Sequence, residues 1–309
     1  VYASGSEAPL REPGSGAVLG VIMMHIGWGI KRPVGGMAEF TKALTACLHH
    51  HGGQTRVDAA VEEILVRDGR ATGVRLADGE TLYAGQVIGA LDPVTLMCGL
   101  VDSAHVSTEV LDEVRNIRIN GWGINNTKID VALAHRPKLL CDRPELWGSY
   151  MLVADDYGYV DRALDTASRG LLPAETPMWA MMPSAADRSQ VPPGSAGDTM
   201  YLFCTAVPDA FADGSDWETH RADFAQQTIG AFEAVAPGFA DATIGSWVKS
   251  PNELRQMTHD GSYVVVDMSL NQMGPNRPCP ALSGYRTPIA GLWHTGAGAH
   301  PMGAVHGWA

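Results

Sequence analysis

The carboxyl-terminal stretch 291–309 holds the residues best suited to bind a ligand. A short apolar run there leads into a loop that contains Gly296, Gly298 and Gly303. Glycine has no Cβ, so a backbone rich in glycine can lie closely against a flat or an anionic group. Binding residues also gather on loops that follow rigid elements. The pattern predicts a ligand-binding loop, followed by a helix whose N-terminus would favour negative charge.

Side chains that could act as acids, bases or metal ligands are few. His294, His300 and His306 recur at equal steps, but no carboxylate lies between them to complete a metal site. The run 49–51 is three histidines on an expected helix, where successive side chains point about 100° apart. No G-x-S-x-G motif is present for a serine hydrolase. We therefore predict no metal site and no side-chain nucleophile.

Two separated segments resemble those of a known enzyme family. The first begins at Gly35 and ends with the turn-rich stretch 68–79, and the second is 284–302. They resemble the middle and the closing flavin-binding segments of phytoene desaturase-like FAD-dependent oxidoreductases. Within that family the branch is that of the pyridine nucleotide-disulphide oxidoreductase domain-containing protein two. The resemblance covers only the C-terminal part of such an enzyme.

The resemblance implies FAD as the cofactor and assigns its binding residues. Val61, which opens the first strand of a meander, would meet the adenine, and the strand end at Ala90 and Leu91 would approach the nucleotide from the other side. Without the family, plain sheet packing explains Val61. The residues that would face the isoalloxazine are Gly296, Gly298, His300, Pro301, Met302, Gly303, Ala304 and Val305. Among these His300 is the candidate polar group for catalysis, and a loop histidine bonded to a carbonyl is the alternative.

The sequence departs from the family at two places. After His-Pro the family reads three glycines and a valine, whereas Met302 and Ala304 stand in this stretch and would weaken flavin binding unless they point away from the ring. The strand, G-x-G-x-x-G turn and helix that would cradle the FAD pyrophosphate are missing. The run from Gly14 to Gly20 has suitable glycines, but it follows a segment with two prolines that cannot be a buried strand.

The ends of the chain favour a C-terminal part of a longer enzyme. The chain begins at Val1 without a methionine and stops at Ala309 inside an expected helix. The same gene or a partner chain would then supply the missing N-terminal half. A split or degenerate relative is the alternative.

Apolar periodicity predicts the elements that position these residues. The spacing of Met37, Leu44 and Leu48 predicts a helix 37–51 that covers one face of a sheet. Hairpin turns are expected at the Asp-Gly pairs that begin at Asp68 and Asp78. Strands are expected at 55–57, 61–66, 72–76, 80–83, 86–90, 127–134, 178–182 and 200–206. A helix 217–236 should bury Phe224, Thr228, Ala231, Phe232 and Val235.

This order of elements predicts an α/β region joined to an α+β region. By resemblance, these are an incomplete two-dinucleotide, Rossmann-like FAD-binding domain and a substrate domain built on a mostly antiparallel sheet roofed by helices. The expected parts are a helical segment of the substrate domain at 1–34, the middle part of the FAD-binding domain at 35–101, the substrate-binding domain at 102–280 and the truncated closing FAD segment at 281–309.

Composition limits the class of protein. The chain has 309 residues, 45% apolar and 18% charged, which suffices for two packed domains. A net charge of -12 without a cluster of lysine and arginine excludes nucleic acid as a partner. No stretch approaches the roughly 18 to 20 apolar residues of a membrane helix. Cysteines are scattered and never spaced as C-x-x-C, which suits a reducing compartment, so we expect the cytoplasm.

The expected activity is that of an FAD-dependent desaturase or dehydrogenase, in which the flavin takes the hydride and the protein supplies position. The substrate implied by the resemblance is apolar, isoprenoid or carotenoid-like, and contact with a membrane surface stays open because such a molecule can be drawn from a bilayer. Two alternatives remain: a redox-neutral isomerase that uses the same flavin, and a non-catalytic binding or assembly subunit. The side chains expected to line a pliable apolar pocket are Met23, Met24, Trp28, Met181, Met182, Met268 and Met273.

Overall fold

The computed structural model describes residues 31–119, 122–154, 156–257 and 265–301. They form two compact units. Of the described residues, unit 1 holds 31–54 and 122–253, and unit 2 holds 55–119, 254–257 and 265–301. The chain thus passes between units at different places from the expected boundaries after 34, 101 and 280. The run from Gly14 to Gly20, and Met23, Met24 and Trp28, lie outside the described residues.

Unit 2 contains a three-stranded antiparallel meander in the order β1-β2-β3. Its strands are β1 (Val61–Arg67), β2 (Arg70–Leu76) and β3 (Thr81–Tyr83). Asp68 and Gly69 join β1 to β2 with φ of 49° and 73°, the positive values that an Asp-Gly turn tolerates. These strands and this turn are confirmed. The strand expected at 55–57 is wrong, because Val57 is exposed and its stretch has no neighbouring strand to bond.

A second sheet of unit 2 consists of two parallel strands. These are β4 (Val87–Gly89) and β10 (Leu292–His294), which come from opposite ends of the described chain. Leu292 pairs with Val87, and His294 pairs with Gly89. The helical elements of this unit are η3 (Thr95–Gly99), η4 (Ser103–His105), α3 (Thr108–Arg115), η7 (Leu270–Gln272), η8 (Gly274–Asn276) and η9 (Pro280–Tyr285). Its core is formed by the side chains of Leu96, Met97, Val114, Leu282 and Leu292, among others.

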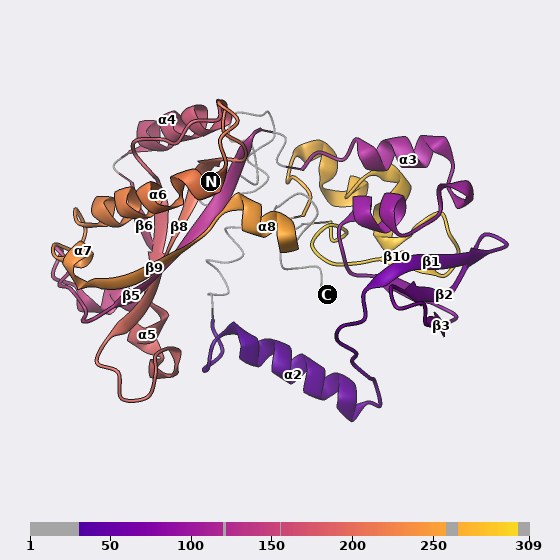
Figure 1. Ribbon diagram of the computed structural model, residues 1–309, viewed down its shortest axis with the longest axis horizontal. Helices are drawn as coiled ribbons and strands as arrows, with labels where there is room; N and C mark the ends of the chain where they lie inside the picture. The colour runs from indigo at the N-terminus through magenta and orange to yellow at the C-terminus, as the bar shows by residue number, and fades with distance from the viewer. Residues whose placement is uncertain (1–30, 120–121, 155, 258–264, 302–309) are drawn as a thin grey trace. The chain divides into compact units, whose positions relative to one another are not determined.

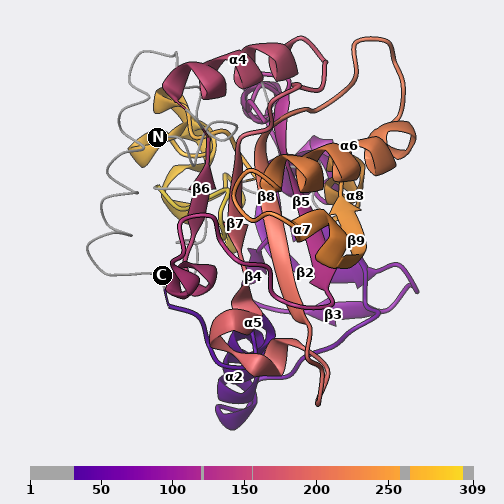
Figure 2. The ribbon, with the colours of Figure 1, turned by 90° about the vertical axis from the view of Figure 1, so that its left-hand side faces the viewer.

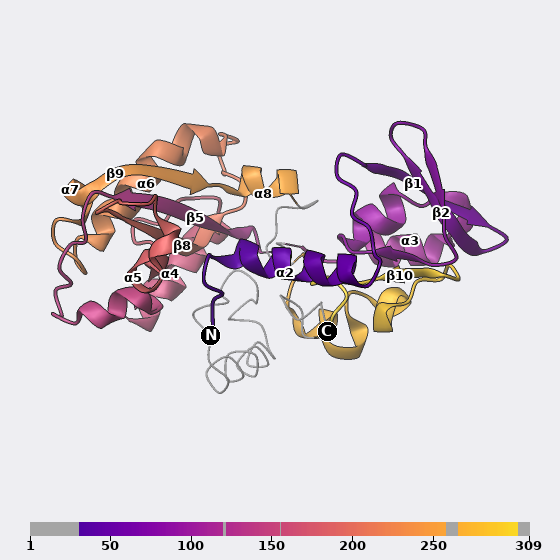
Figure 3. The ribbon, with the colours of Figure 1, turned by 90° about the horizontal axis from the view of Figure 1, so that it is seen from below.

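Helix α2 (Met37–His50) of unit 1 has the predicted extent but not the predicted role. Figure 3 shows it as one unbroken helix. None of its residues is buried, and its apolar side chains Met37, Leu44 and Leu48 are 57%, 51% and 45% exposed. The expectation that this helix covers a sheet is therefore wrong for the described part of the chain, since no described strand buries its apolar stripe.

Unit 1 is built on a five-stranded antiparallel sheet in the order β6-β7-β8-β5-β9. The strands are β5 (Ile124–Leu133), β6 (Met151–Val153), β7 (Met178–Met181), β8 (Asp198–Pro208) and β9 (Thr243–Lys249). The remaining helical elements are η5 (Pro144–Gly148), α4 (Tyr157–Ser168), α5 (Pro183–Ala186), η6 (Arg188–Gln190), α6 (Trp217–Phe232), α7 (Phe239–Ala242) and α8 (Pro251–Met257), whose last turn belongs to unit 2. Figures 1 and 2 show β5 and β8 as long strands at the centre of this sheet.

Helix α6 covers one face of this sheet. Its residues Phe224 and Phe232 join the core formed by alternate residues of β5 and β8, such as Ile129 and Leu202. Ala231 is exposed, contrary to the prediction, because it lies beside the buried stripe rather than on it. Successive side chains of a strand point to opposite faces, so the residues between the core positions form a second face of the sheet.

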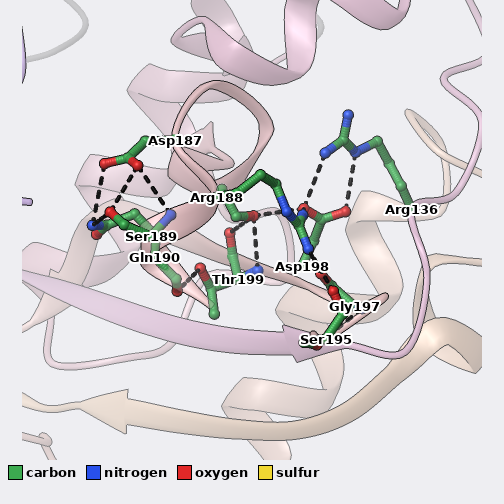
Figure 4. Close-up of polar contacts among 10 residues, drawn as sticks. Arg136, Asp187, Arg188, Ser189, Gln190, Ser195, Gly197, Asp198 and Thr199 are labelled. Carbon is green, nitrogen blue, oxygen red and sulfur yellow. Dashed lines mark hydrogen bonds and ion pairs between the residues drawn. The ribbon is translucent and has the colours of Figure 1, made fainter. Parts of the chain in front are cut away.

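A buried carboxylate holds the chain between α5 and β8 (Figure 4). Asp198 opens β8 and accepts hydrogen bonds from Arg136 (3.0 and 3.1 Å), Arg188 (2.6 Å) and Ser184 (2.7 Å). Arg188 also bonds the carbonyls of Ser195 and Gly197. Burial would raise the pKa of Asp198, but the bonds from Arg136 and Ser184 and the arginine charges lower it below its ordinary value. The carboxylate therefore stays charged and ties this loop to the sheet.

Two further contacts attach the end of η6 to the same strand. The hydroxyl of Thr199 donates to the carbonyl oxygen of Gln190 at 3.1 Å, and the amide of Thr199 donates to Ser184 at 3.0 Å. Gln190 is thereby fixed against the second residue of β8.

We expect Asp198→Asn to lower the free energy of unfolding by about 3 kcal/mol, because a neutral amide leaves two arginines without their buried anion. Asp165→Asn is the matched control, since Asp165 forms an exposed ion pair with Arg169, and it should cost about 0.5 kcal/mol or less. Urea unfolding followed by circular dichroism measures both. Equal losses in the two variants would show that the Asp198 network does not stabilise the fold.

Candidate functional site

The carboxyl ends of β4 and β10 meet at one edge of their sheet. Because the strands are parallel and in register from Val87 to Gly89, the residues that follow them leave the sheet on the same side. In open sheets of this kind, ligands bind outside the carboxyl ends of the strands. A cavity of about 420 Å³ lies there, lined by Ala90, Leu91, Asp92, Thr95, Arg255, Gln256, Val265, Thr295, Gly296, Ala297 and Gly298.

Glycines give these loops their course. A Cβ on Gly89 would lie 2.5 Å from the side chain of Leu96, so a larger residue at this strand end would have to displace that buried leucine. Gly296 has φ of +99°, a conformation that other residues rarely adopt. A Cβ on Gly298 would come within 3.4 Å of Val265, His294 and Pro93. The backbone that follows β10 is therefore packed against its neighbours and presents itself to the cavity.

A fully buried histidine links the two strand ends. His294 has no exposed surface, and its Nε2 lies 3.0 Å from the carbonyl oxygen of Leu91. Burial lowers the pKa of His294, so the ring is neutral at neutral pH and donates from Nε2 to that carbonyl. Its Nδ1 is buried with no hydrogen-bond partner in the described part of the chain.

A buried arginine holds the loop after β10 from behind. The guanidinium of Arg277 donates to the carbonyl oxygen of Ala297 at 2.9 and 3.2 Å. It also donates to the carbonyls of Val266 (2.9 Å), Asp267 (3.2 Å) and Gln272 (3.2 Å). Burial lowers the pKa of Arg277 to about 10, so the group keeps its positive charge at neutral pH.

The polar edge of the cavity comes from the turn before η3 and from α8. Asp92 Oδ1 accepts a hydrogen bond at 2.7 Å from the amide of Thr95, the first residue of η3. Arg255 and Gln256 line the cavity from the last turn of α8. The arrangement offers backbone and a few fixed charges to a ligand but no nucleophile, so any demanding chemistry must come from a bound cofactor.

The structure brings together four of the residues assigned from sequence. Ala90, Leu91, Gly296 and Gly298 line one cavity, although about 200 residues separate the two pairs. Val61 does not line it. That residue stands at the start of β1, paired with Leu76 and 37% exposed.

The remaining assigned residues lie at or beyond the end of the described chain. The amide of His300 donates to the carbonyl oxygen of Gly296, and its ring lies 6.4 Å from that of Tyr285. The carbonyl oxygen of Pro301 accepts from the amide of Gly274. Neither residue lines the cavity. Met302, Gly303, Ala304, Val305 and His306 lie outside the described residues.

Sequence reasoning missed Asp92, Thr95 and Arg277. An aspartate followed by a proline favours the start of a turn, which is a local signal at Asp92. No local pattern marks Arg277, because its partners are backbone carbonyls of distant segments. The histidine run 49–51 ends α2, and no group of three or more possible metal ligands occurs among the residues that the structure describes.

The chain is similar to named oxidoreductases over most of its length. It is 28% identical to pyridine nucleotide-disulfide oxidoreductase domain-containing protein 2 of Mus musculus, an alignment that covers 88% of this chain and 48% of that protein. It is 24% identical to phytoene desaturase (neurosporene-forming) of Cereibacter sphaeroides, over 91% of this chain and 52% of the desaturase. The chain spans about half the length of the curated relatives it matches. No family model matches it.

Solved structures share its fold. An oxidoreductase from Methanosarcina mazei aligns with a TM-score of 0.56 at 17% identity, over 88% of this chain and 51% of that one. A putrescine oxidase variant aligns with a TM-score of 0.51 at 11% identity, over 89% and 51% of the two chains. The resemblance drawn from the two sequence segments is therefore confirmed, and the relatives do not favour a non-catalytic binding subunit.

Among the residues that the structure describes, none of the helices has both the length and the apolar character needed to cross a bilayer.

The buried neutral His294 should make stability depend on pH. In the unfolded chain a histidine binds a proton near its ordinary pKa of about 6.5, whereas the folded pKa is lower. Below that ordinary value the unfolded state holds more protons, so the free energy of unfolding falls by up to about 1.4 kcal/mol per pH unit until the folded pKa is reached. As the pH rises again through the ordinary pKa of histidine, the free energy of unfolding recovers.

The measurement compares urea unfolding at about pH 5.5 and about pH 7.5. His294→Gln keeps a donor for Leu91 and should lose less stability on acidification than the unsubstituted protein. His105→Gln, at an exposed histidine of the same unit, should leave the pH dependence unchanged. The interpretation fails if His294→Gln retains the full dependence.

Proposed function

We propose that this chain is the C-terminal part of an FAD-dependent oxidoreductase whose flavin ring binds at the carboxyl ends of β4 and β10. The observation that carries the proposal is the cavity where Ala90 and Leu91 meet Gly296 and Gly298. Its place beside parallel strand ends is typical of nucleotide cofactor sites. The oxidoreductase and desaturase relatives support the same class of reaction.

The residues at this cavity fit a flat cofactor. The volume of about 420 Å³ is within the range of small-molecule sites. The side-chain-free backbone at Gly296 and Gly298 allows a ring to lie close to the loop. The ring of His294, whose Nδ1 has no hydrogen-bond partner among the described residues, adjoins Gly298.

FAD would supply a ring that accepts a hydride, so the protein need supply only position, exclusion of water and dipoles. The charge of Arg277 stands directly behind Ala297 and favours negative charge on a group in the cavity. The neutral His294 adds no charge, so it does not oppose this effect. Asp92 and Arg255 lie at the polar edge and can orient a ligand.

The nucleotide-binding half would come from another segment of the same gene or from a partner chain. Parallel sheets are normally buried on both faces, yet Ile88 of β4 is 65% exposed and Trp293 of β10 is 37% exposed. The apolar stripe of α2 is exposed as well. We infer that β4 and β10 belong to a larger, Rossmann-like parallel sheet. An upstream coding segment with a strand, a G-x-G-x-x-G turn and a helix would support this inference.

The substrate would be a largely apolar molecule, isoprenoid or carotenoid-like. This part of the proposal rests on the family resemblance and on the names of the desaturase relatives. The methionine lining expected from sequence supports it little. Met181, Met182 and Met268 are all buried, and Met181 also lines a cavity of about 250 Å³.

A bulky side chain at Ala90 should block the flavin. Ala90 is exposed and lines the cavity, so a tryptophan there enters the space without disturbing the core. We expect Ala90→Trp to weaken FAD binding by the full-length protein at least about tenfold, a loss of about 1.4 kcal/mol. Titration of FAD, followed by quenching of its fluorescence, measures the affinity.

Ala84→Trp is the matched control, because Ala84 is an exposed alanine of the same unit outside the cavity. It should leave FAD affinity unchanged, and both variants should melt within a few degrees of the unsubstituted protein. A full-length protein that takes up no FAD, or an Ala90→Trp variant that binds it normally, would refute the proposed site.

A further inference from the structure

A second cavity lies on the face of the unit 1 sheet that α6 does not cover. Its volume is about 480 Å³. Lys128, Trp179, Tyr201 and Phe203 line it, each standing between core residues of β5, β7 or β8. Arg32, Met37, Asp130, Tyr150, Pro183, Gln190, Thr199 and Met200 complete the lining.

Among the residues that the structure describes, the cationic edge of this cavity is only partly neutralised. Arg32 Nη2 donates to the hydroxyl of Tyr201 at 2.6 Å and to that of Tyr150 at 3.3 Å. Within the described residues no carboxylate pairs with Arg32. Lys128 is compensated by Asp130 at 2.7 Å. One positive charge therefore remains at the cavity.

Both cationic side chains of the cavity lie near the ring of Tyr201. The guanidinium carbon of Arg32 is 5.4 Å, and Nζ of Lys128 is 5.2 Å, from the centroid of its ring. Burial raises the pKa of Tyr201, so the phenol stays neutral and its hydroxyl donates to the sulfur of Met181. Two cations thus approach one neutral ring, an arrangement that an added anion would stabilise.

Aromatic side chains form the floor beside these cations. The ring of Trp179 packs edge to face on the ring of Tyr150, with 5.8 Å between the ring centroids. The centroid of the Phe203 ring is 5.9 Å from that of Trp179. The indole Nε1 of Trp179 has no acceptor in the described part of the chain. Planar apolar molecules pack well on such surfaces.

We propose that this cavity binds an organic anion, a carboxylate attached to a flat or extended apolar body. Arg32 holds the carboxylate through its guanidinium, and the aromatic floor holds the body. No lining residue of this cavity lines the flavin cavity of the proposed function, so the anion site does not depend on that proposal.

The test uses 2-naphthoate and its uncharged isostere 2-naphthamide as probes, with affinities measured by isothermal titration calorimetry on the full-length protein. Naphthoate should bind at least about tenfold more tightly than naphthamide, the factor expected for one charge-assisted hydrogen-bonded contact. Arg32→Gln should remove this preference and leave naphthamide affinity unchanged. Arg32→Lys should retain part of it, because the charge stays while the planar fork is lost.

Arg169→Gln is the matched control, since Arg169 is an exposed arginine of the same unit outside the cavity. It should keep the full preference for naphthoate. Equal affinities of the two probes, or an unchanged preference in Arg32→Gln, would overturn the proposal. Because binding is read without turnover, FAD content can be measured separately. A flavin-free protein that still prefers naphthoate would support the anion site and refute the oxidoreductase.

Discussion

The guanidinium of Arg277 fixes the backbone on which the candidate flavin site depends. Burying a charge costs several kcal/mol, which must be offset by well-placed acceptors. Here the acceptors include carbonyls of Val266, Asp267, Gln272 and Ala297, segments that share no sheet or helix. Removing the cation would take these hydrogen bonds from all four carbonyls, of which Asp267 also accepts from Gln272, and would release the loop after β10. One side chain thus links the carbonyls of residues 266–272 to the loop after β10.

The two-stranded parallel sheet explains where the site lies. Its register pairs Gly89 with His294, so the loops after both strands begin at the same level along the strand direction. The bond from His294 to Leu91 then joins one loop to the other. Strand pairing therefore determines where the residues after β4 and β10 lie at the cavity. The glycines of these loops determine how much space the cavity has. The side chains of Ile88 and Trp293 on this sheet are exposed among the residues that the structure describes.

Local patterns in the sequence predicted much of this structure. The Asp68-Gly69 turn, the meander strands and the main strands of unit 1 depend on alternation and turn chemistry, which act between near neighbours. Ala90 and Leu91 were assigned through the family resemblance, whereas the glycines of the loop after β10 also stood out by their local spacing. The failures involve long-range contacts: the partner of α2, the unpaired stretch at Val57, and the acceptors of Arg277. Such contacts leave no periodic trace, because they join segments that are far apart in the chain.

The Asp198 network has a consequence for the cavity on the unit 1 sheet. Gln190 lines that cavity, and its carbonyl is bonded to Thr199, the residue after Asp198. The part of the cavity wall formed by Gln190 is therefore ordered before a ligand binds. A ligand would lose its own translational and rotational entropy on binding, but little further free energy would be needed to order the protein. This favours rapid association and an affinity determined by the contacts in the cavity. Discrimination between ligands would then depend on their complementarity to the cavity rather than on closure of a lid.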